Sequence, residues 1–191
     1  MFNRCKNLTE VNNMSVLNTK SLKYLSGLFN GCTNLTKIGK LSFKSQNIED
    51  VSIMFQDCAK LPLIETSFEH AKSIKNISGM FAGCKSATKI IPGIYYTENL
   101  INMAALCKGC EVLESLHDIG GSCKYNMAKV EFAQTMLSNC KMLRTVKWLA
   151  NIKFKAGINF DEILKDSNFN YYTYNIKKEW EKNQIKPTEK K

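Results

Sequence analysis

Apolar residues recur along this chain with a long period. Five-residue blocks that begin with Met or Leu and end in Cys occur six times, and their cysteines are 27, 26, 26, 26 and 30 residues apart. The blocks span residues 1–5, 28–32, 54–58, 80–84, 106–110 and 136–140. Self-similarity at such a period is typical of stacked repeat architectures. Each repeat unit is named here after its cysteine.

A shorter spacing of three surrounds each block. Apolar residues stand three and six positions after the cysteine, as Leu35 and Ile38 do, and three and six positions before the next Met or Leu, as Ile48 and Val51 do. This spacing alone would suit a helix, but turn formers interrupt it at matching places, so short strands and tight turns are expected. The residue before each cysteine is mostly of a type that accepts left-handed backbone angles. These residues are Arg4, Gly31, Asp57, Gly83, Gly109 and Asn139.

One repeat unit buries too few apolar side chains to offset the entropy of ordering its backbone, so the units must stack. The pattern predicts a right-handed, leucine-rich-repeat-like solenoid of short β-strands and turns, with about six coils over residues 1–150. Residues 151–191 are expected to form a C-terminal cap, with a short helix over 176–185 and a basic tail over 186–191. The aromatic stretch 168–174 is expected to pack over the last coil, with a contact patch as the alternative.

Six of the eight cysteines occupy one repeat position. They are Cys5, Cys32, Cys58, Cys84, Cys110 and Cys140. Cysteine is among the most buried residue types, so a structural ladder of packed thiols is expected; disulfides between neighbouring rungs are the alternative. Cys107 and Cys110 form a CxxC motif that, with Cys123 and Cys140, would give four thiolates for a zinc site. Because Cys107 stands in an aromatic core position and the motif's other members are ladder residues, packing is favoured, and neither a metal nor a cofactor is expected.

Charge and candidate chemistry argue against several functions. The formal net charge is +10 and is spread along the chain, and Lys37 and Lys89 share a repeat position whose other occupants break any continuous lysine row, so nucleic-acid binding is not favoured. His70 and His117 belong to different units and have no repeat-equivalent partners, so no acid–base or nucleophilic set can be assembled. The sequence lacks a run of about 18 apolar residues that would indicate a membrane span. We therefore expect a protein that is not an enzyme.

The unit Met-Phe-x-x-Cys-x-x-Leu-x-x-Ile, followed by a variable stretch and Ile-x-x-Ile/Met, resembles the BspA-like leucine-rich repeat, especially the variant of mycoplasmal and other bacterial surface proteins. The resemblance covers about residues 1–150. Departures are Cys107 and Leu137 in the Phe position, Ala87 in the Leu position, and a longer fifth unit that contains residues 120–123. The resemblance implies a noncatalytic role in binding or adhesion, on bacterial surfaces or in phage-encoded structural proteins, and it supplies no catalytic residues.

Recognition is expected on the outside of the stack, because interior positions are nearly constant between units while one exterior position varies. That position holds Lys23, Glu49, Lys75, Ile101 and Glu131. An extended exterior of this kind suits a protein or glycan ligand, which makes the chain a receptor- or host-binding module of a cell surface or phage particle. The resemblance favours such a location, and the lack of a secretory signal at the start of the chain leaves an intracellular one open.

The alternative function is that of an assembly scaffold. The first unit begins on the repeat phase at Met1 without a polar cap, although the ends of a solenoid need covering to stay soluble. The hypothesis is that this open coil docks to a neighbouring domain or subunit of its own complex.

Overall fold

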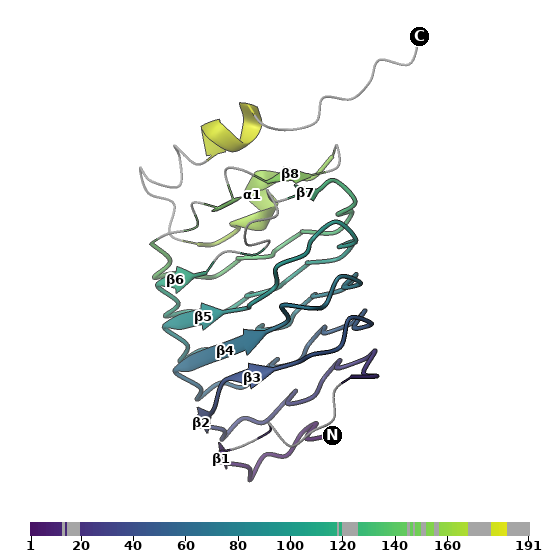
Figure 1. Ribbon diagram of the computed structural model, residues 1–191. Helices are drawn as coiled ribbons and strands as arrows, with labels where there is room; N and C mark the ends of the chain where they lie inside the picture. Colours follow the sequence, from purple (N-terminus) through teal and green to yellow (C-terminus); the bar gives the residue numbers. More distant parts are fainter. Residues whose placement is uncertain are drawn as a thin grey trace.

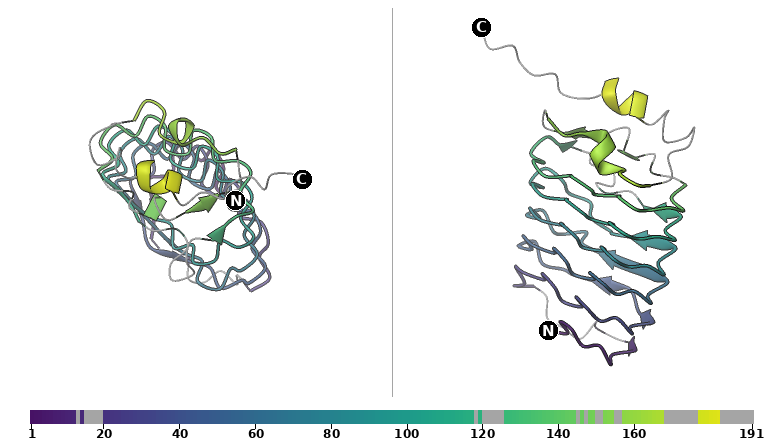
Figure 2. Two further views of the ribbon diagram at one scale, coloured as in Figure 1. Left: turned by 90° about the horizontal axis from the view of Figure 1, so that it is seen from above. Right: turned by 180° about the vertical axis from the view of Figure 1, so that it is seen from behind.

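The computed structural model describes most of the chain. The described residues are 1–12, 14, 20–117, 119, 126–144, 146, 148–149, 152–154, 157–167 and 177–182. Within them the chain runs in successive turns that lie one above the other, from the N-terminal residues to helix α1 (Phe160–Ile163) near the other end (Figure 1). Viewed along the stack, these turns overlie one another (Figure 2). Residues 120–123, the aromatic stretch 168–174 and the tail 186–191 lie outside the described residues.

The strands are short, and the pairings among the described residues are parallel. Their bounds are β1 Glu10–Val11, β2 Lys37–Ile38, β3 Leu41–Ser42, β4 Leu63–Ser67, β5 Lys89–Ile91, β6 Ser115–Leu116, β7 Asn126–Met127 and β8 Lys153–Phe154. β1 pairs with β2, β3 to β6 form a four-stranded sheet in chain order, and β7 pairs with β8. Adjacent parallel strands run in the same direction, so the chain between them must cross back to the end of the sheet where the previous strand began. The rest of each repeat unit makes this crossing.

The pairing register joins equivalent positions of adjacent units. Glu10 pairs with Lys37, and Lys89 pairs with both Leu63 and Ser115, so the partners are 26 or 27 residues apart. A second row of parallel bridges runs through Tyr24, Asp50, Asn76, Asn102 and Phe132. Because parallel neighbours lie about 4.8 Å apart, side chains at one repeat position form columns along the stack. The right-handed, leucine-rich-repeat-like solenoid of about six coils stays a prediction.

The interior of the stack is a continuous apolar core. A column of stacked rings runs through it, formed by Phe2, Phe29, Phe55 and Phe81. Consecutive ring centroids are 5.3, 5.4 and 5.9 Å apart. Cys107 and Leu137, which replace Phe in the next two units, are fully buried, so the column continues with smaller side chains. Burial of each large apolar side chain contributes about 2 kcal/mol, which makes this core the main force between units.

Two positions in each unit have left-handed backbone. One is the residue before the cysteine, where φ is 57° at Arg4, 58° at Asp57 and 57° at Asn139, and positive at the glycines that share this position. The predicted left-handed turn is therefore confirmed. The other is the residue before the Met or Leu of each block from the second onwards, which the sequence pattern does not predict. Its occupants are Gly27, Ile53, Gly79, Ala105 and Thr135.

The chain beyond the last repeated cysteine packs on the final units. The indole of Trp148 donates a hydrogen bond to the carbonyl oxygen of Leu116 at 3.2 Å. Phe154 of β8 contacts the buried ring of Trp180, with centroids 6.3 Å apart. Trp180 belongs to a helical segment at residues 177–182, inside the range expected for a helix. Helix α1 is an element that the sequence pattern does not predict.

Candidate functional site

The five exterior residues predicted as an interaction surface lie in one line along the stack, which we call the outer column. They are Lys23, Glu49, Lys75, Ile101 and Glu131. The N–H of each later residue donates a hydrogen bond to the carbonyl oxygen of the one before it, at 2.8 or 2.9 Å. Glu49 is half-buried and the other four are exposed. The structure thus brings these residues together on one backbone ladder.

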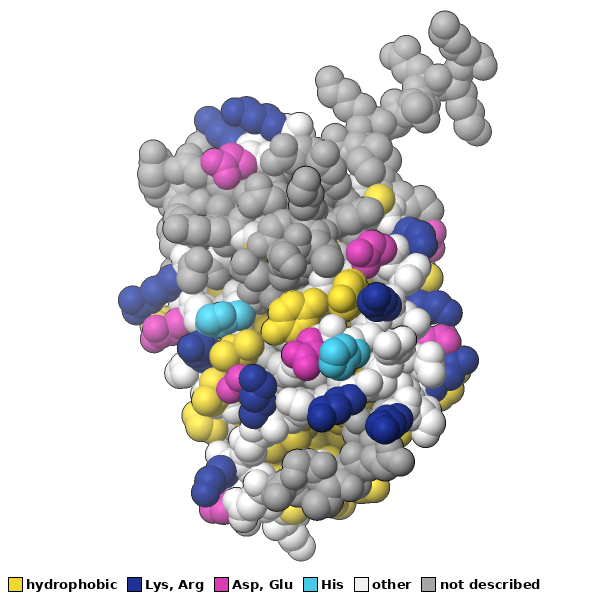
Figure 3. Space-filling view, in the orientation of Figure 1, with side chains coloured by type: hydrophobic (Ala, Val, Ile, Leu, Met, Phe, Trp, Pro, Cys, Tyr) yellow, Lys and Arg dark blue, Asp and Glu magenta, His cyan; other side chains and the backbone are white. Residues whose placement is uncertain are grey.

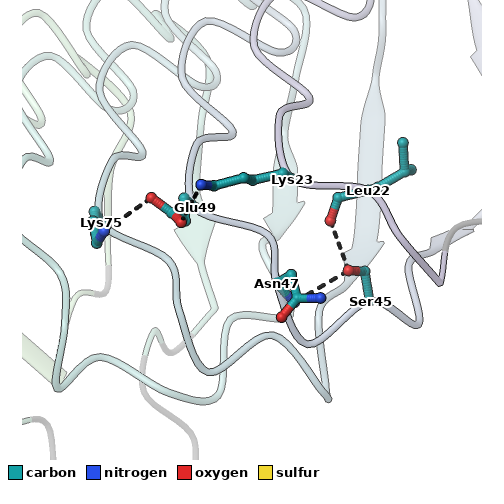
Figure 4. Close-up of polar contacts among 6 residues, drawn as sticks. All are labelled: Leu22, Lys23, Ser45, Asn47, Glu49 and Lys75. Carbon is teal, nitrogen blue, oxygen red and sulfur yellow. Dashed lines mark hydrogen bonds and ion pairs between the residues drawn. The ribbon is translucent and has the colours of Figure 1, made fainter.

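A chain of ion pairs occupies the first part of the outer column. The carboxylate of Glu49 lies 2.9 Å from Nζ of Lys23 and 2.8 Å from Nζ of Lys75 (Figure 4). Hydrogen bonds from Lys75 and Lys23 lower the pKa of Glu49, and the hydrogen bond to Glu49 raises the pKa of Lys23. Glu49 and Lys23 therefore stay charged through the neutral range. Two lysines around one glutamate leave one excess positive charge.

A column of Asp and Asn side chains next to the outer column fixes the backbone. Oδ1 of Asp50 accepts a hydrogen bond from the N–H two residues on at 2.8 Å, and Asn76 and Asn102 make the same contact at 3.0 Å. Local bonds of this kind stabilise turns. At both ends this position holds aromatic residues, Tyr24 and Phe132, which are 64% and 46% exposed. Neither residue was predicted as part of the surface; the signal was an aromatic residue directly after a predicted surface position.

The repeated cysteines form a column inside the stack, except for the first. Those with fully buried side chains are Cys32, Cys58, Cys84, Cys110 and Cys140. Each of these thiols donates to a carbonyl oxygen of the preceding unit, as Cys58 does to Phe29 and Cys84 to Phe55 at 3.2 Å. Cys5 is exposed, which corrects the expectation that it is a buried member of the ladder. Its unit lies at the end of the described stack and has a neighbouring unit on one side (Figure 1).

Burial raises the pKa values of four interior thiols. Desolvation raises the pKa of Cys58 to about 12, and it raises the pKa values of Cys84, Cys107 and Cys140 well above the ordinary thiol value. Protonated thiols are poor nucleophiles and poor metal ligands. In the part of the chain that the structure describes, no three His, Cys, Asp or Glu side chains are grouped to hold a metal ion. Cys123, the remaining thiol of the zinc alternative, lies outside that part.

A polar groove lies at the turns around the cysteines, and we call it the turn groove. It has a volume of about 500 Å³ and opens to solvent. Its polar lining includes Arg4, Lys6, Asn30, Gln56, Asp57 and Lys85. This groove was not predicted from the sequence. Gly31 and Gly83, at the position before the cysteine, belong to the lining, but the repeat pattern does not indicate that residues of four units form a groove there.

Other candidate groups remain apart from one another. His70 and His117 are exposed, and Nε2 of His70 lies 3.3 Å from a carboxylate oxygen of its neighbour Glu69. Lysine side chains are scattered among acidic, apolar and neutral ones on the face shown in Figure 3. One of the exterior lysines, Lys40, pairs with Glu65 at 3.0 Å.

Among the helices of the described residues, none has the length and apolar character needed to cross a membrane.

A family model matches most of the chain. The model of DUF285, described as a Mycoplasma protein of unknown function, matches residues 1–91 and 65–176. Neither the curated proteins nor the solved structures gave a match. The two matched stretches overlap, and together they include the outer column, the thiol column and the turn groove. The chain therefore belongs to DUF285, a family of Mycoplasma proteins of unknown function.

Proposed function

We propose that the chain is a right-handed, leucine-rich-repeat-like solenoid of the BspA-like class, with about six coils and a C-terminal cap, and that it acts as a non-enzymatic binding module for a protein or glycan. The parallel pairing of positions one repeat apart supports this proposal. The stacked aromatic rings and buried thiols support it as well, because they use the interior for packing. In such a module the exterior is the surface free for contact.

The observation that carries the proposal is the outer column. Its backbone is held by ladder hydrogen bonds, while its side chains change from unit to unit between basic, acidic and apolar types. Binding sites are most precise when varied side chains project from a rigid element. Exposed Ile101 lies beside Phe132, whose N–H donates to the Ile101 carbonyl oxygen at 3.3 Å. This apolar pair, next to charged neighbours, has the composition of a contact surface.

The proposed role of the module is adhesion or receptor binding on a bacterial surface or a phage particle. Membership of a Mycoplasma family supports a bacterial setting. The repeat unit, with Met-Phe-x-x-Cys followed by Leu and Ile at intervals of three, resembles repeats of mycoplasmal and other bacterial surface proteins. A location at the cell surface or in a virion is part of the same proposal.

Binding of the labelled, purified protein to host-cell surfaces tests the proposal. The variant Ile101→Glu/Phe132→Glu places charge on the apolar pair, and we expect its apparent affinity to fall by at least about tenfold. The matched control is Leu63→Glu/Tyr95→Glu, because these side chains are exposed to a similar degree, 46% and 42%, away from the outer column. Circular dichroism and thermal unfolding verify that both variants fold. Absence of saturable binding by the wild type would refute the proposed function, and equal losses in both variants would refute the outer column as its site.

A second candidate function, an assembly scaffold that docks through the first coil, is favoured by the end of the stack. Met1 is 81% exposed and borders a cavity of about 330 Å³. The cavity has a mainly apolar lining that includes Leu22, Leu25, Leu28 and Phe43. For this function the native protein would copurify with sibling proteins in a fixed ratio, and Leu22→Glu would abolish that copurification without changing host-cell binding. Purification of the native protein without such partners would exclude it.

A further inference from the structure

The turn groove crosses four repeat units, from Arg4 and Lys6 in the Cys5 unit to Lys85 in the Cys84 unit. Parallel neighbours lie about 4.8 Å apart, so three such steps give a groove about 14 Å long. Its volume of about 500 Å³ falls within the range of about 300–1,000 Å³ that is typical of ligand sites. The groove is therefore long and large enough for a short oligomeric ligand.

Glycine occupies two of the left-handed turn positions that line the groove. φ is 71° at Gly31 and 72° at Gly83. A Cβ at Gly83 would collide with Oδ1 of Asp57, and a Cβ at Gly31 would lie 3.2 Å from Cγ of Arg4. The side chains of Arg4 and Asp57 therefore lie across the glycines of the neighbouring units. A ligand in the groove would meet these two side chains directly.

The walls of the groove present polar and apolar surface in similar measure, and hydrogen-bonding groups make up the polar part. The amides of Asn30 and Gln56, the hydroxyl of Thr33 and the carboxylate of Asp57 all line it. Among the described lining residues, Ala59 alone has an apolar side chain that is not the stem of a charged one. Amides donate and accept hydrogen bonds, and a carboxylate accepts them. This chemistry matches a ligand that is rich in hydroxyl groups.

The charge of the groove favours an anion. Three cationic side chains and one carboxylate line it, which gives a net formal charge of +2. Nζ of Lys85 already lies 3.3 Å from the carboxylate of Glu111. Arg4 and Lys6 are exposed, and the described residues provide no carboxylate partner for either. The Arg4 end is therefore where an acidic group of a ligand would bind, and the planar guanidinium can contact a carboxylate or sulfate through two hydrogen bonds.

We propose that the turn groove binds an anionic oligosaccharide. This inference rests on the proposed function as an exterior binding module and names the ligand class of one site. A protein partner is disfavoured, because protein hot spots need large aromatic or aliphatic anchors in well-packed pockets, and Ala59 is the largest purely apolar side chain among the described residues of the groove. Single-stranded nucleic acid is disfavoured because the described lining has no aromatic ring for a base to stack on. Acidic groups pair with Arg4 and Lys6, and sugar hydroxyls bond to Asn30, Gln56 and Asp57.

Direct titration with four probes of similar length tests the proposal: a sulfated hexasaccharide, a uronate hexasaccharide, a neutral glucose hexasaccharide and a hexaglutamate peptide. We expect one or both acidic saccharides to bind more tightly than the neutral saccharide and the peptide. The variant Arg4→Gln/Lys6→Gln should weaken that binding by at least about tenfold and leave the thermal unfolding temperature close to that of the wild type. Lys89→Gln/Lys182→Gln is the matched control, since it removes the same charge from exposed positions outside the groove and should retain wild-type affinity.

Three results would overturn the inference: equal affinity for the neutral saccharide, tighter binding of the peptide, or the same loss of affinity in the control variant. Competition of host-cell binding by the probes separates this inference from the proposed function. Saturable cell binding without any saccharide binding would support the proposed binding module and refute the groove as an oligosaccharide site. Saccharide binding that the Arg4→Gln/Lys6→Gln variant loses, without any cell binding, would support the groove as the oligosaccharide site and refute the adhesion role.

Discussion

Gly93 stands where the backbones of two neighbouring units approach each other closely. Its φ is 59°, and a Cβ at this position would collide with the carbonyl oxygen of Thr66 and lie 2.8 Å from Cα of Ser67. Gly109 has a similar φ of 74°, but the nearest atom to a Cβ there, the amide nitrogen of Gly83, would be 4.0 Å away. The two glycines thus share a backbone conformation and differ in the space around them.

We predict that Gly93→Ala lowers the free energy of unfolding by about 3 kcal/mol or more, and Gly109→Ala by about 1–2 kcal/mol. A left-handed alanine costs about 1–2 kcal/mol. A backbone that must shift to admit an extra methyl group in a packed region adds about 1–3 kcal/mol. Urea unfolding followed by circular dichroism gives both values. Equal losses would mean that the backbone around Gly93 adjusts freely, contrary to the close approach described above.

Cys5 and the interior thiols differ in access to solvent. We predict that a soluble thiol reagent at pH 8 modifies Cys5 rapidly in the folded protein, and modifies Cys58, Cys84 and Cys140 only as the protein unfolds. Burial excludes the reagent from these three, and their raised pKa values keep them protonated. Peptide mapping by mass spectrometry over a time course measures each rate, with urea-unfolded protein as the control. Rapid modification of Cys84 in folded protein would contradict the buried column.

The raised pKa of Cys58 also predicts a loss of stability in alkaline solution. Its pKa in the folded protein, about 12, lies above the ordinary value of 9.0, so the folded state holds the proton more tightly than the unfolded state. Its stabilising effect is complete below pH 9 and is lost as the pH rises from 9 towards 12, at about 1.4 kcal/mol per pH unit at most. We expect Cys58→Ala to show a shallower decline than the wild type between pH 9 and 11 in urea unfolding. Parallel declines would argue against burial of this group.

At the scale of elements, the sequence predicts one left-handed turn per unit and misses the other. The turn before the cysteine was predictable because Gly, Asn and Asp, which accept such angles, occupy most of its positions. The second turn contains Ile53 and Thr135, whose branched side chains disfavour positive φ. The side chain of Ile53 lies over its glycine neighbours, within 3.8 Å of the Cβ position of Gly27 and 3.2 Å of that of Gly79. Packing between units sets this turn, so local residue preferences could not reveal it.

Stacked Asp and Asn side chains hold the bend beside the outer column. We predict that Asn76→Ala lowers the free energy of unfolding by about 1 kcal/mol, because it removes the acceptor for the N–H of Ser78 at 3.0 Å and the amide contact with Asp50 at 3.4 Å. Ser78→Ala is the control, since it keeps the N–H and its bond to Asn76. Thermal unfolding of both variants measures the difference. A larger loss in Ser78→Ala would show that the hydroxyl, and not the turn, stabilises this bend.

At the scale of the whole molecule, the outer column was predictable and the turn groove was not. The repeat phase determines which positions face outwards, so Lys23, Glu49 and Lys75 could be assigned to one column without any structure. The groove is lined by residues from four units, and no local pattern encodes that combination. The exposure of Cys5 was not predictable either. Its repeat position resembles the others, and its exposure depends on its place at the end of the described stack.

Stacking of equivalent positions predicts that one repeat unit can be removed without changing the phase of the others. Deletion of residues 59–84 takes out one 26-residue period and joins Cys58 to Lys85, so every later side chain keeps its inward or outward position. We predict that this variant folds cooperatively, with a lower free energy of unfolding and a urea m-value lower by about one-seventh, because stability and buried surface in stacked repeats grow unit by unit.

Deletion of residues 59–82 is the matched control for this prediction, because it removes almost as many residues but shifts the phase by two. It places Lys85 three residues after Cys58, at the fully buried position of Leu61. A charged side chain in that core is costly, so the control should unfold or aggregate. Circular dichroism, urea unfolding and size-exclusion chromatography distinguish the two variants. If both fold equally well, or if the in-phase deletion fails as the control does, then the units are not interchangeable layers, and neither the outer column nor the groove can be explained by their stacking.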